Sequence, residues 1–203
     1  MTRSLKPEWL AESVSDEVQP EEGASDCWLT IFAALADGRV AVLDELYDLA
    51  AADVYRLALW RVGSAEDAED VVQDVFVRVA EQGHRLAAVR RPRTWLLTVA
   101  HRCAVDLCRR NRRRQADPVE ETPYLTAPAA DPDRGIEAET LSRLIARLPE
   151  KQREVILLRH FADCTFSDIG RITGVPTFTA ASRHRLAVAK LRRLLEKNHE
   201  TTS

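Results

Sequence analysis

Residues 90–114 read RRPRTWLLTVAHRCAVDLCRRNRRR, and this stretch decides the fold. No proline or glycine interrupts it between Trp95 and Arg113, so it predicts one continuous helix. Apolar residues recur at spacings of three and four, as on the buried side of an amphipathic helix: Leu96, Val99, Ala100, Cys103 and Leu107. Another face has the same spacing but is mostly polar: Thr98, Arg102, Asp106, Arg109 and Arg113, with Trp95 one turn before Thr98. We therefore expect a helix that packs on one side and presents guanidinium groups, a hydroxyl and an indole on the other.

The same region concentrates positive charge. Residues 85–114 hold ten of the 29 basic residues, all arginine, and one acid, so the segment carries +9 while the whole chain carries −3. Guanidinium groups pair bidentately with phosphate oxygens, and the bases of single-stranded DNA stack on aromatic rings. A solvated charged face is the simpler explanation of such a run. Charge of one sign is self-repulsive without an anionic partner, however, so a nucleic-acid surface is favoured.

The run TWLLTVAHRCAVDLCRR, residues 94–110, resembles the promoter-melting helix of the extracytoplasmic-function (ECF) sigma factors, whose pattern is WL…A.N…D..RR. The matching residues are Trp95, Leu96, Ala100, Asp106, Arg109 and Arg110. Residues 43–79 resemble the preceding helices of the same domain, and the resemblance extends over about residues 30–198. It implies an all-α fold of two small helical domains, a sigma region 2-like bundle and a sigma region 4-like helix-turn-helix, joined by a flexible linker.

The resemblance also implies which residues recognise and melt the minus-ten element: Arg91, Trp95, Thr98, His101, Arg102, Arg109, Arg110 and Arg113. His101 stands where the family usually has Asn. An Asn amide both donates and accepts a hydrogen bond with a fixed sense, whereas a neutral imidazole does so in one tautomer only. We therefore expect an altered preference for promoter bases.

A helix is expected at about residues 65–81, with Ser64 as its N-cap and Asp67 three residues on. Upstream of it, two amphipathic segments are broken near Gly63 and Ser64, and their apolar residues are Leu43, Leu46 and Leu49, then Val54, Leu57 and Ala58. The acids near the start of residues 65–81 suit the helix dipole, which is the simpler interpretation. The resemblance implies that this helix docks on the clamp coiled coil of core RNA polymerase through Asp70, Gln73, Asp74 and Val77. Three further apolar residues are expected in the core: Val71, Val72 and Phe76.

Residues 137–198 predict a second helical domain. Thr165 and Asp168 form a capping box at the start of a short helix. A glycine-containing turn over residues 174–177 follows, and then a basic helix over about 177–197. This is the order of a helix-turn-helix, whose second helix enters the major groove of duplex DNA. A helical hairpin of no function has a similar pattern, so the specificity comes from its place after the sigma-like first domain.

The family pattern for that second helix, GVP.GTVKSRL.RAR..L, is only partly matched by GVPTFTAASRHRLAVAKLRRLL, residues 174–195. Phe178 replaces a Gly, Ala181 a Lys or Arg, and Leu186 an Arg. The loss of two cations predicts weaker phosphate contact and a shifted choice of promoter bases. His184 falls on an apolar stripe and is expected to pack. The minus-thirty-five contacts implied by the resemblance are Thr177, Thr179, Ala181, Ser182, Arg183 and Arg185.

The remaining segments flank the two domains, residues 27–114 and 137–198. Residues 1–26 hold seven acids and two cations, and we expect a disordered acidic arm that could mask the basic face of its own chain. Residues 115–136 contain four of the nine prolines and five acids, as in a flexible linker. Residues 199–203 form a short tail.

Composition narrows the function classes. No apolar run approaches the roughly 20 residues of a membrane span, and no secretion signal begins the chain. The four cysteines form no CxxC pair, and Cys103 and Cys108 are expected to pack as small apolar residues. We therefore expect a cytoplasmic bacterial protein with no metal, no cofactor, no small-molecule substrate and no direct membrane insertion.

The leading hypothesis is a transcription initiation factor whose partners are core RNA polymerase and promoter DNA. Family analogy adds an anti-sigma factor. The alternative is a stand-alone helix-turn-helix regulator, which would bind duplex operators without polymerase. An enzyme is a remote third class, because the chain has no nucleotide-binding glycine loop, HExxH helix or GxSxG elbow.

Overall fold

The computed structural model describes residues 22–114 and 135–202. Every element in these two ranges is a helix, as the sequence predicted. The helices form two units, which are described one at a time. Most of the expected acidic arm and nearly all of the expected linker lie outside the described residues.

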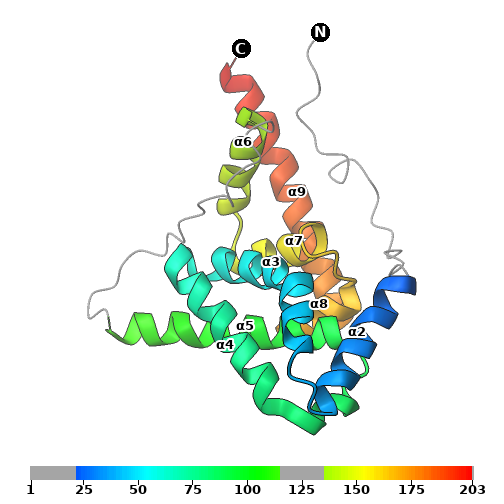
Figure 1. The fold of residues 1–203 in the computed structure, drawn as a ribbon. Coiled ribbons are helices and arrows are strands. Elements are labelled where there is room, and N and C mark those ends of the chain that lie inside the picture. Colours follow the sequence, from blue (N-terminus) through cyan, green and yellow to red (C-terminus); the bar gives the residue numbers. More distant parts are fainter. Residues whose placement is uncertain (1–21, 115–134, 203) are drawn as a thin grey trace. The chain divides into compact units, whose positions relative to one another are not determined.

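The first unit consists of α2 (Glu22–Ala36), α3 (Val42–Val62), α4 (Ala65–Gln82), the 3-10 turn η1 (Gly83–Ala88) and α5 (Pro92–Arg114). Figure 1 shows α5 as one long helix that crosses α3 and α4, and both of these pack against it. The sequence predicted two segments where the structure has the single helix α3. No proline or glycine separates them, and the alanines between them favour helix.

The start of α4 is fixed locally, as expected. The Ser64 hydroxyl accepts a hydrogen bond from the Asp67 backbone N–H at 3.3 Å, which satisfies one of the free donors of the first turn. Gly63 ends α3 with a φ of 80°, a left-handed conformation that favours glycine. A short α3–α4 connection follows, so the two helices lie side by side.

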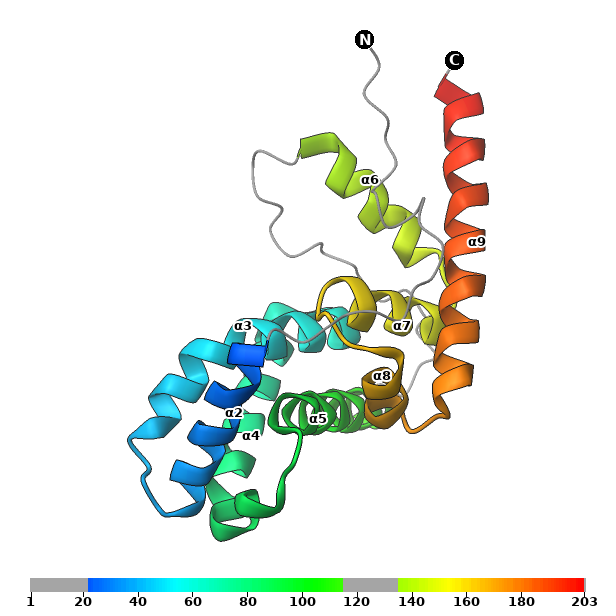
Figure 2. The ribbon, with the colours of Figure 1, turned by 90° about the vertical axis from the view of Figure 1, so that its right-hand side faces the viewer.

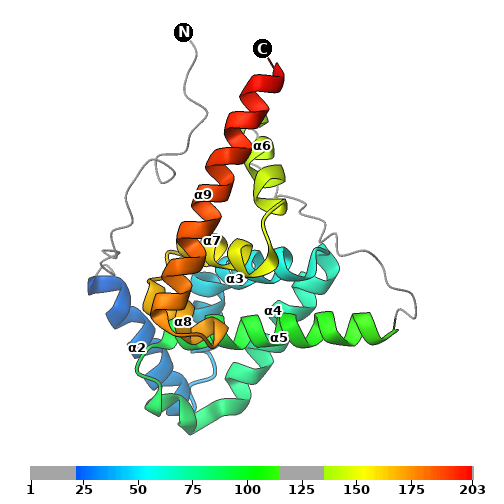
Figure 3. The same cartoon turned by 180° about the vertical axis from the view of Figure 1, so that it is seen from behind.

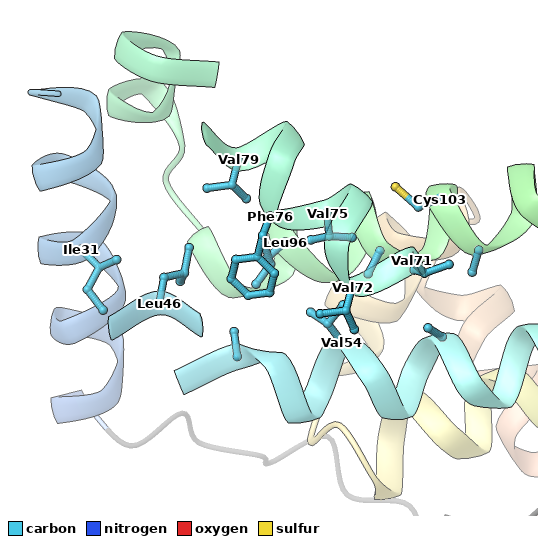
Figure 4. Close-up of a cluster of buried hydrophobic side chains, with 14 of the residues drawn as sticks. Ile31, Leu46, Val54, Val71, Val72, Val75, Phe76, Val79, Leu96 and Cys103 are labelled. Carbon is cyan, nitrogen blue, oxygen red and sulfur yellow. The ribbon is translucent and has the colours of Figure 1, made fainter. Parts of the chain in front are cut away.

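Branched and aromatic side chains from all of these helices meet in one core. Figure 4 shows Ile31 of α2, Leu46 of α3, Phe76 of α4 and Leu96 of α5 within this cluster. The residues predicted for the core on α4 are buried: Val71, Val72 and Phe76. Leu49, which was assigned to an amphipathic segment of α3, is instead exposed. The core therefore holds α5 by its apolar face and leaves Arg102, Arg109 and Arg113 exposed to solvent on the opposite face.

The second unit consists of α6 (Gly135–Ala146), α7 (Glu150–His160), α8 (Phe166–Thr173) and α9 (Thr177–Thr202). Helix α9 packs against α7, and α6 runs beside its C-terminal half (Figure 3). The predicted capping box is present, because Asp168 N–H donates to the Thr165 hydroxyl at 3.1 Å and that hydroxyl donates to the Asp168 carboxylate at 2.6 Å. Helix α9 continues five residues beyond its expected end, since no helix breaker occurs before residue 202.

Figure 2 shows the turn between α8 and α9. Two glycines determine its path. Gly174 has a φ of 71°. The Val175 N–H donates to the Gly170 carbonyl at 2.9 Å, which draws the turn onto α8. A Cβ on Gly170 would lie 2.7 Å from the Val175 carbonyl oxygen, closer than real Cβ atoms approach. A side chain at this position would therefore push the turn away from α8.

Candidate nucleic-acid interface

The buried face of α5 has the predicted residues. Leu96, Ala100 and Cys103 are at most 1% exposed, and Val99 and Leu107 are partly buried against the core. Two residues that the periodicity did not assign, Leu97 and Ala104, are also buried. Burial raises the pKa of the Cys103 thiol, so this cysteine stays a protonated, apolar core residue.

The opposite face of α5 carries the arginines into solvent. Five of the eight residues expected to contact the minus-ten region are exposed: Arg91, Arg102, Arg109, Arg110 and Arg113. The other three are half-buried: Trp95, Thr98 and His101. Among the described residues, no ion pair involves Arg102, Arg109 or Arg113. Their guanidinium groups are thus available to an external anion.

Trp95 is more enclosed than the sequence suggested. Its ring lies edge to face against Phe32 of α2, with ring centroids 5.8 Å apart and planes at 84°. Phe32 is itself buried to 1% exposure. Such edge-to-face pairs hold aromatic rings in one orientation. Phe32 of helix α2 therefore holds the indole of Trp95 in place. The residues near Trp95 in the sequence gave no sign of this contact.

The Thr98 hydroxyl already has a partner within α5. It donates to the Thr94 carbonyl at 2.7 Å, one turn earlier. Its oxygen lone pairs remain able to accept a hydrogen bond. Thr98 therefore offers an acceptor to a ligand.

A shallow, open hollow lies between α4 and α5. It is lined by four arginines and two aspartates: Asp74, Arg78, Asp106, Arg109, Arg110 and Arg113. Arg110 Nη2 lies 3.9 Å from Asp74 Oδ2 across it. Asp106 lies at helical spacing from Arg102, Arg109 and Arg110, but among the described residues no ion pair joins it to any of them. Arg110 instead pairs with Asp74 of the neighbouring helix α4.

Not every arginine of the segment is available to an external ligand. Arg93 Nη2 donates to Asp53 Oδ2 of α3 at 2.9 Å, and Arg56 pairs with the other oxygen of the same carboxylate. Asn111 Nδ2 donates to Asp67 of α4 at 3.3 Å. These contacts fix α5 against α3 and α4. Asp53 lies 40 residues from Arg93 in the sequence, and Asp67 lies 44 residues from Asn111, so sequence spacing did not reveal these two contacts.

The outer face of α4 presents the four residues expected to contact polymerase. Asp70, Gln73, Asp74 and Val77 are all exposed, and their spacing places them on one side of the helix. Val77 is 56% exposed, an apolar group among acids. Sequence reasoning missed Tyr47 of α3, whose exposed ring packs on Phe76 with centroids 4.9 Å apart. Tyr47 therefore places an exposed aromatic ring on α3 where that helix packs against α4.

The first turns of α9 present the residues expected to read the minus-thirty-five element. Two are exposed, Thr177 and Arg185, and four are half-buried: Thr179, Ala181, Ser182 and Arg183. The replacements noted in the sequence are also at the surface, because Phe178 and Leu186 are exposed. The packing side of α9 is formed by Ala180, His184, Ala187 and Leu191, as the apolar stripe predicted.

His184 anchors α9 on α7. Its Nε2 lies 2.8 Å from His160 Nε2, and its ring meets Phe166 with centroids 5.3 Å apart. Burial lowers the pKa of His184 to about 4, with a contribution from Arg159. Burial and His184, with Arg159, lower the pKa of His160 to about 3. Both imidazoles are therefore neutral at pH 7, and one can donate to the other. His160 and Phe166 were not singled out from the sequence.

A buried arginine supports the same unit. Arg153 of α7 is 8% exposed, and its Nη2 donates to the Leu148 carbonyl at 3.0 Å, just after α6 ends.

In the described ranges, no three His, Cys, Asp or Glu side chains gather as metal ligands would. None of the described helices is long and apolar enough to cross a bilayer.

Two family models match the chain, each over one of these units. The model for sigma-70 region 2 matches residues 46–114, and the model for sigma-70 region 4 matches residues 138–191. The chain is 31% identical over 173 residues to the ECF RNA polymerase sigma factor RpoE of Cereibacter sphaeroides, covering 81% of this chain and 93% of that protein. It is 30% identical over 166 residues to the ECF RNA polymerase sigma factor SigL of Mycobacterium tuberculosis, and the match covers 80% of this chain and 93% of SigL.

Two solved structures share the fold. One is CnrH in complex with the cytosolic domain of CnrY, with a TM-score of 0.61, 22% identity and coverage of 83% of this chain and 97% of that chain. The other is the sigma factor RpoE in complex with the anti-sigma factor NepR from Bartonella quintana, with a TM-score of 0.63, 20% identity and coverage of 75% and 96%.

Proposed function

The chain belongs to the extracytoplasmic-function sigma factors of the sigma-70 family, and we propose that the exposed face of α5 captures the melted strand of the promoter. As an RNA polymerase sigma factor it binds the core enzyme and directs it to promoters. The finer proposal concerns which residues do this. The single observation that carries it is that Arg102, Arg109 and Arg113 share one solvent-exposed face and have no described ionic partner.

The chemistry of that face suits a single strand. Each guanidinium can hold two phosphate oxygens, and neutralising phosphates releases counterions from the DNA. Trp95, held by Phe32, offers a ring of fixed orientation at the head of the row. Unstacking a base costs a few kcal/mol, which stacking on an aromatic ring offsets by about 1–3 kcal/mol per base. We infer that Trp95 and His101 receive bases while the arginines hold the backbone.

A second contact is proposed for α4. Asp70, Gln73, Asp74 and Val77 would dock on a basic and partly apolar surface of core polymerase, with Tyr47 at its edge. Charged groups at an interface steer association, and an exposed apolar centre supplies contact area. The domain boundaries at residues 27–114 and 137–198 separate this surface and the α5 face from the minus-thirty-five contacts proposed for α9.

We further propose that an anti-sigma factor regulates this chain. Support comes from the two solved structures of the same fold. In one, CnrH is bound to the cytosolic domain of CnrY, and in the other, RpoE is bound to the anti-sigma factor NepR. Such a partner would cover the basic face of α5 or the acidic face of α4. The site of action would be the bacterial cytoplasm, and no chemistry of its own is assigned to the chain.

The test is run-off transcription with purified core polymerase. DNA-dependent transcripts that require this protein are expected, and a gel shift with the protein alone should show little duplex binding. Tight binding to duplex DNA without polymerase, and no effect on transcription, would instead identify a stand-alone regulator. The Arg102→Gln, Arg109→Gln and Arg113→Gln triple variant should still bind the core enzyme but yield few transcripts.

A further inference from the structure

Helix α9 exposes two large apolar side chains in the region proposed to meet duplex DNA. Phe178 is 74% exposed and Leu186 is 57% exposed. Because both side chains stay in water, neither contributes the free energy of apolar burial to folding. The stability of the folded chain therefore does not explain why they are apolar. Both also depart from the family pattern, which has Gly at the first position and Arg at the second.

The two side chains belong to one row. Phe178, Ser182 and Leu186 are spaced by four residues, so they follow one another along a single side of α9. This side lies away from Ala180 and Ala187, which pack into the second unit at 0% exposure. The row thus lies on the side of α9 that faces away from its packing residues, with the half-buried Ser182 between two exposed apolar groups.

Cations border the row on both sides. Residues 177–197 contain six Lys or Arg and one acid, Glu196. By helical position, Arg185 lies on one side of the row and Arg183 and Lys190 on the other. A protein partner for an apolar strip would need a compensating acidic rim. A DNA groove supplies it directly, because phosphates run along both of its walls.

In the major groove, the base that offers an apolar group to such a row is thymine. Its 5-methyl group projects into the major groove, where no other base carries a comparable group, and apolar side chains contact it. The row of a helix that points into the groove meets base edges, while the bordering cations reach the backbone.

We propose that Phe178 and Leu186 read thymine methyl groups in the minus-thirty-five element of the promoters this protein recognises. This inference rests on the proposed function of α9 as the minus-thirty-five reader. It assigns specificity to two of the three residues that replace the family's usual ones, and at Leu186 the chain exchanges an arginine contact for an apolar one. Thymines spaced about two turns of helix α9 apart, on either side of the base met by Ser182, are the expected targets.

The experiment uses the holoenzyme, assembled from core polymerase and the full chain. A promoter library randomised over the upstream element is selected for holoenzyme binding. Each enriched thymine is then replaced by deoxyuridine, which lacks only the 5-methyl group. We expect about fourfold weaker binding at each contacted thymine, the effect of withdrawing one methyl-sized group from apolar contact.

Variants assign the contact to its residue. Phe178→Ala and Leu186→Ala should each abolish the deoxyuridine penalty at one thymine and leave the penalty at the other. Val40→Ala, which removes an equally exposed apolar side chain from the first unit, should change neither penalty.

Three results would overturn the inference. The enriched element could contain no thymine, deoxyuridine could bind as well as thymine, or the penalty could persist in both variants. Loss of core polymerase binding in Phe178→Ala, with the deoxyuridine penalty absent in the wild-type protein, would assign the row to a protein contact. Selection of no upstream element at all would instead contradict the proposed function of α9, so the two failures are distinguishable.

Discussion

Arg110 Nη2 of α5 lies 3.9 Å from Asp74 Oδ2 of α4, with the two side chains 55% and 51% exposed. The pair joins a residue proposed to hold DNA to a residue proposed to bind polymerase. Exposed ion pairs stabilise a fold by only about 0–1 kcal/mol, because water screens both charges. The contact therefore contributes little to folding, and either residue can be replaced without unfolding the bundle.

The first prediction separates the two proposed roles. Asp74→Asn should weaken core polymerase binding by roughly tenfold, which corresponds to about 1.4 kcal/mol. Arg110→Gln should leave polymerase binding unchanged and reduce the fraction of open promoter complex. Fluorescence anisotropy with labelled chain measures the first quantity, and 2-aminopurine fluorescence in the minus-ten region measures the second.

The control pair is Asp37→Asn and Arg39→Gln, another exposed contact at 3.8 Å. These variants should match the wild-type protein in both assays. Equal defects in Asp74→Asn and Arg110→Gln in both assays would show that the two surfaces do not act separately.

The second prediction concerns the support of Trp95. Phe32→Leu keeps an apolar side chain but removes the ring, its edge-to-face contact and part of its volume, so it should cost about 1 kcal/mol or more of unfolding free energy. Without that contact the indole loses its fixed orientation, and permanganate reactivity of minus-ten thymines should fall several-fold. Ile31→Val is the matched control, because Ile31 is buried on the same helix and points toward Leu46 (Figure 4). Equal loss of opening in both variants would attribute the effect to stability alone.

The third prediction is a pH dependence of the second unit. The folded-state pKa values of His160 and His184 lie below the ordinary value of 6.5, mainly because both side chains are buried. The unfolded chain therefore binds protons that the folded chain excludes. Stability should be full above about pH 6.5 and should fall progressively as the pH drops toward 4. NMR signals of the backbone amides in α7 and α9, recorded from pH 7 to pH 4, measure the stability of this unit.

The double variant His160→Gln, His184→Gln should lose most of this pH dependence. His84→Gln, at an exposed site in the first unit, should retain it. A wild-type second unit whose stability is constant from pH 7 to pH 4 would contradict the assignment of the buried histidine pair.

The fourth prediction tests the turn before α9. Gly170→Ala places a Cβ 2.7 Å from the Val175 carbonyl oxygen, so the turn must shift. Overpacking of this kind costs about 1–3 kcal/mol. Thermal unfolding should register that loss, and minus-thirty-five binding should weaken more than core polymerase binding. Gly38→Ala also strains a left-handed glycine, with a φ of 82°, but meets no atom within 4 Å, and should leave promoter binding intact.

Local patterns in the sequence predicted the helices and their caps. The spacing of Leu96, Ala100 and Cys103 identified the buried face of α5, and Ser64 and Thr165 identified two helix starts. These predictions were confirmed because each depends on residues within one or two turns of each other. The same reasoning wrongly divided α3 into two segments, since a change in apolar pattern does not end a helix without a breaker.

Contacts between distant segments were beyond sequence reasoning. The sequence placed Trp95 on the polar face, but Phe32, 63 residues before it, packs edge to face against its ring. Arg93 contributed to the positive charge counted over residues 85–114, and the structure pairs it with Asp53 of α3. Asp106 has the spacing to brace Arg110, yet Asp74 of another helix lies nearer. In each case the deciding partner comes from a separate helix, and one sequence carries no signal for such a pair.

The most direct test of the central proposal is promoter opening by holoenzyme that carries Arg102→Gln, Arg109→Gln and Arg113→Gln. Its control carries Arg39→Gln, Arg147→Gln and Lys151→Gln, which remove the same charge from exposed positions outside the proposed surfaces. Permanganate reactivity of minus-ten thymines should fall at least tenfold in the first protein and stay unchanged in the control, with equal core polymerase affinity in both. Opening at the wild-type level by the first protein would contradict the account.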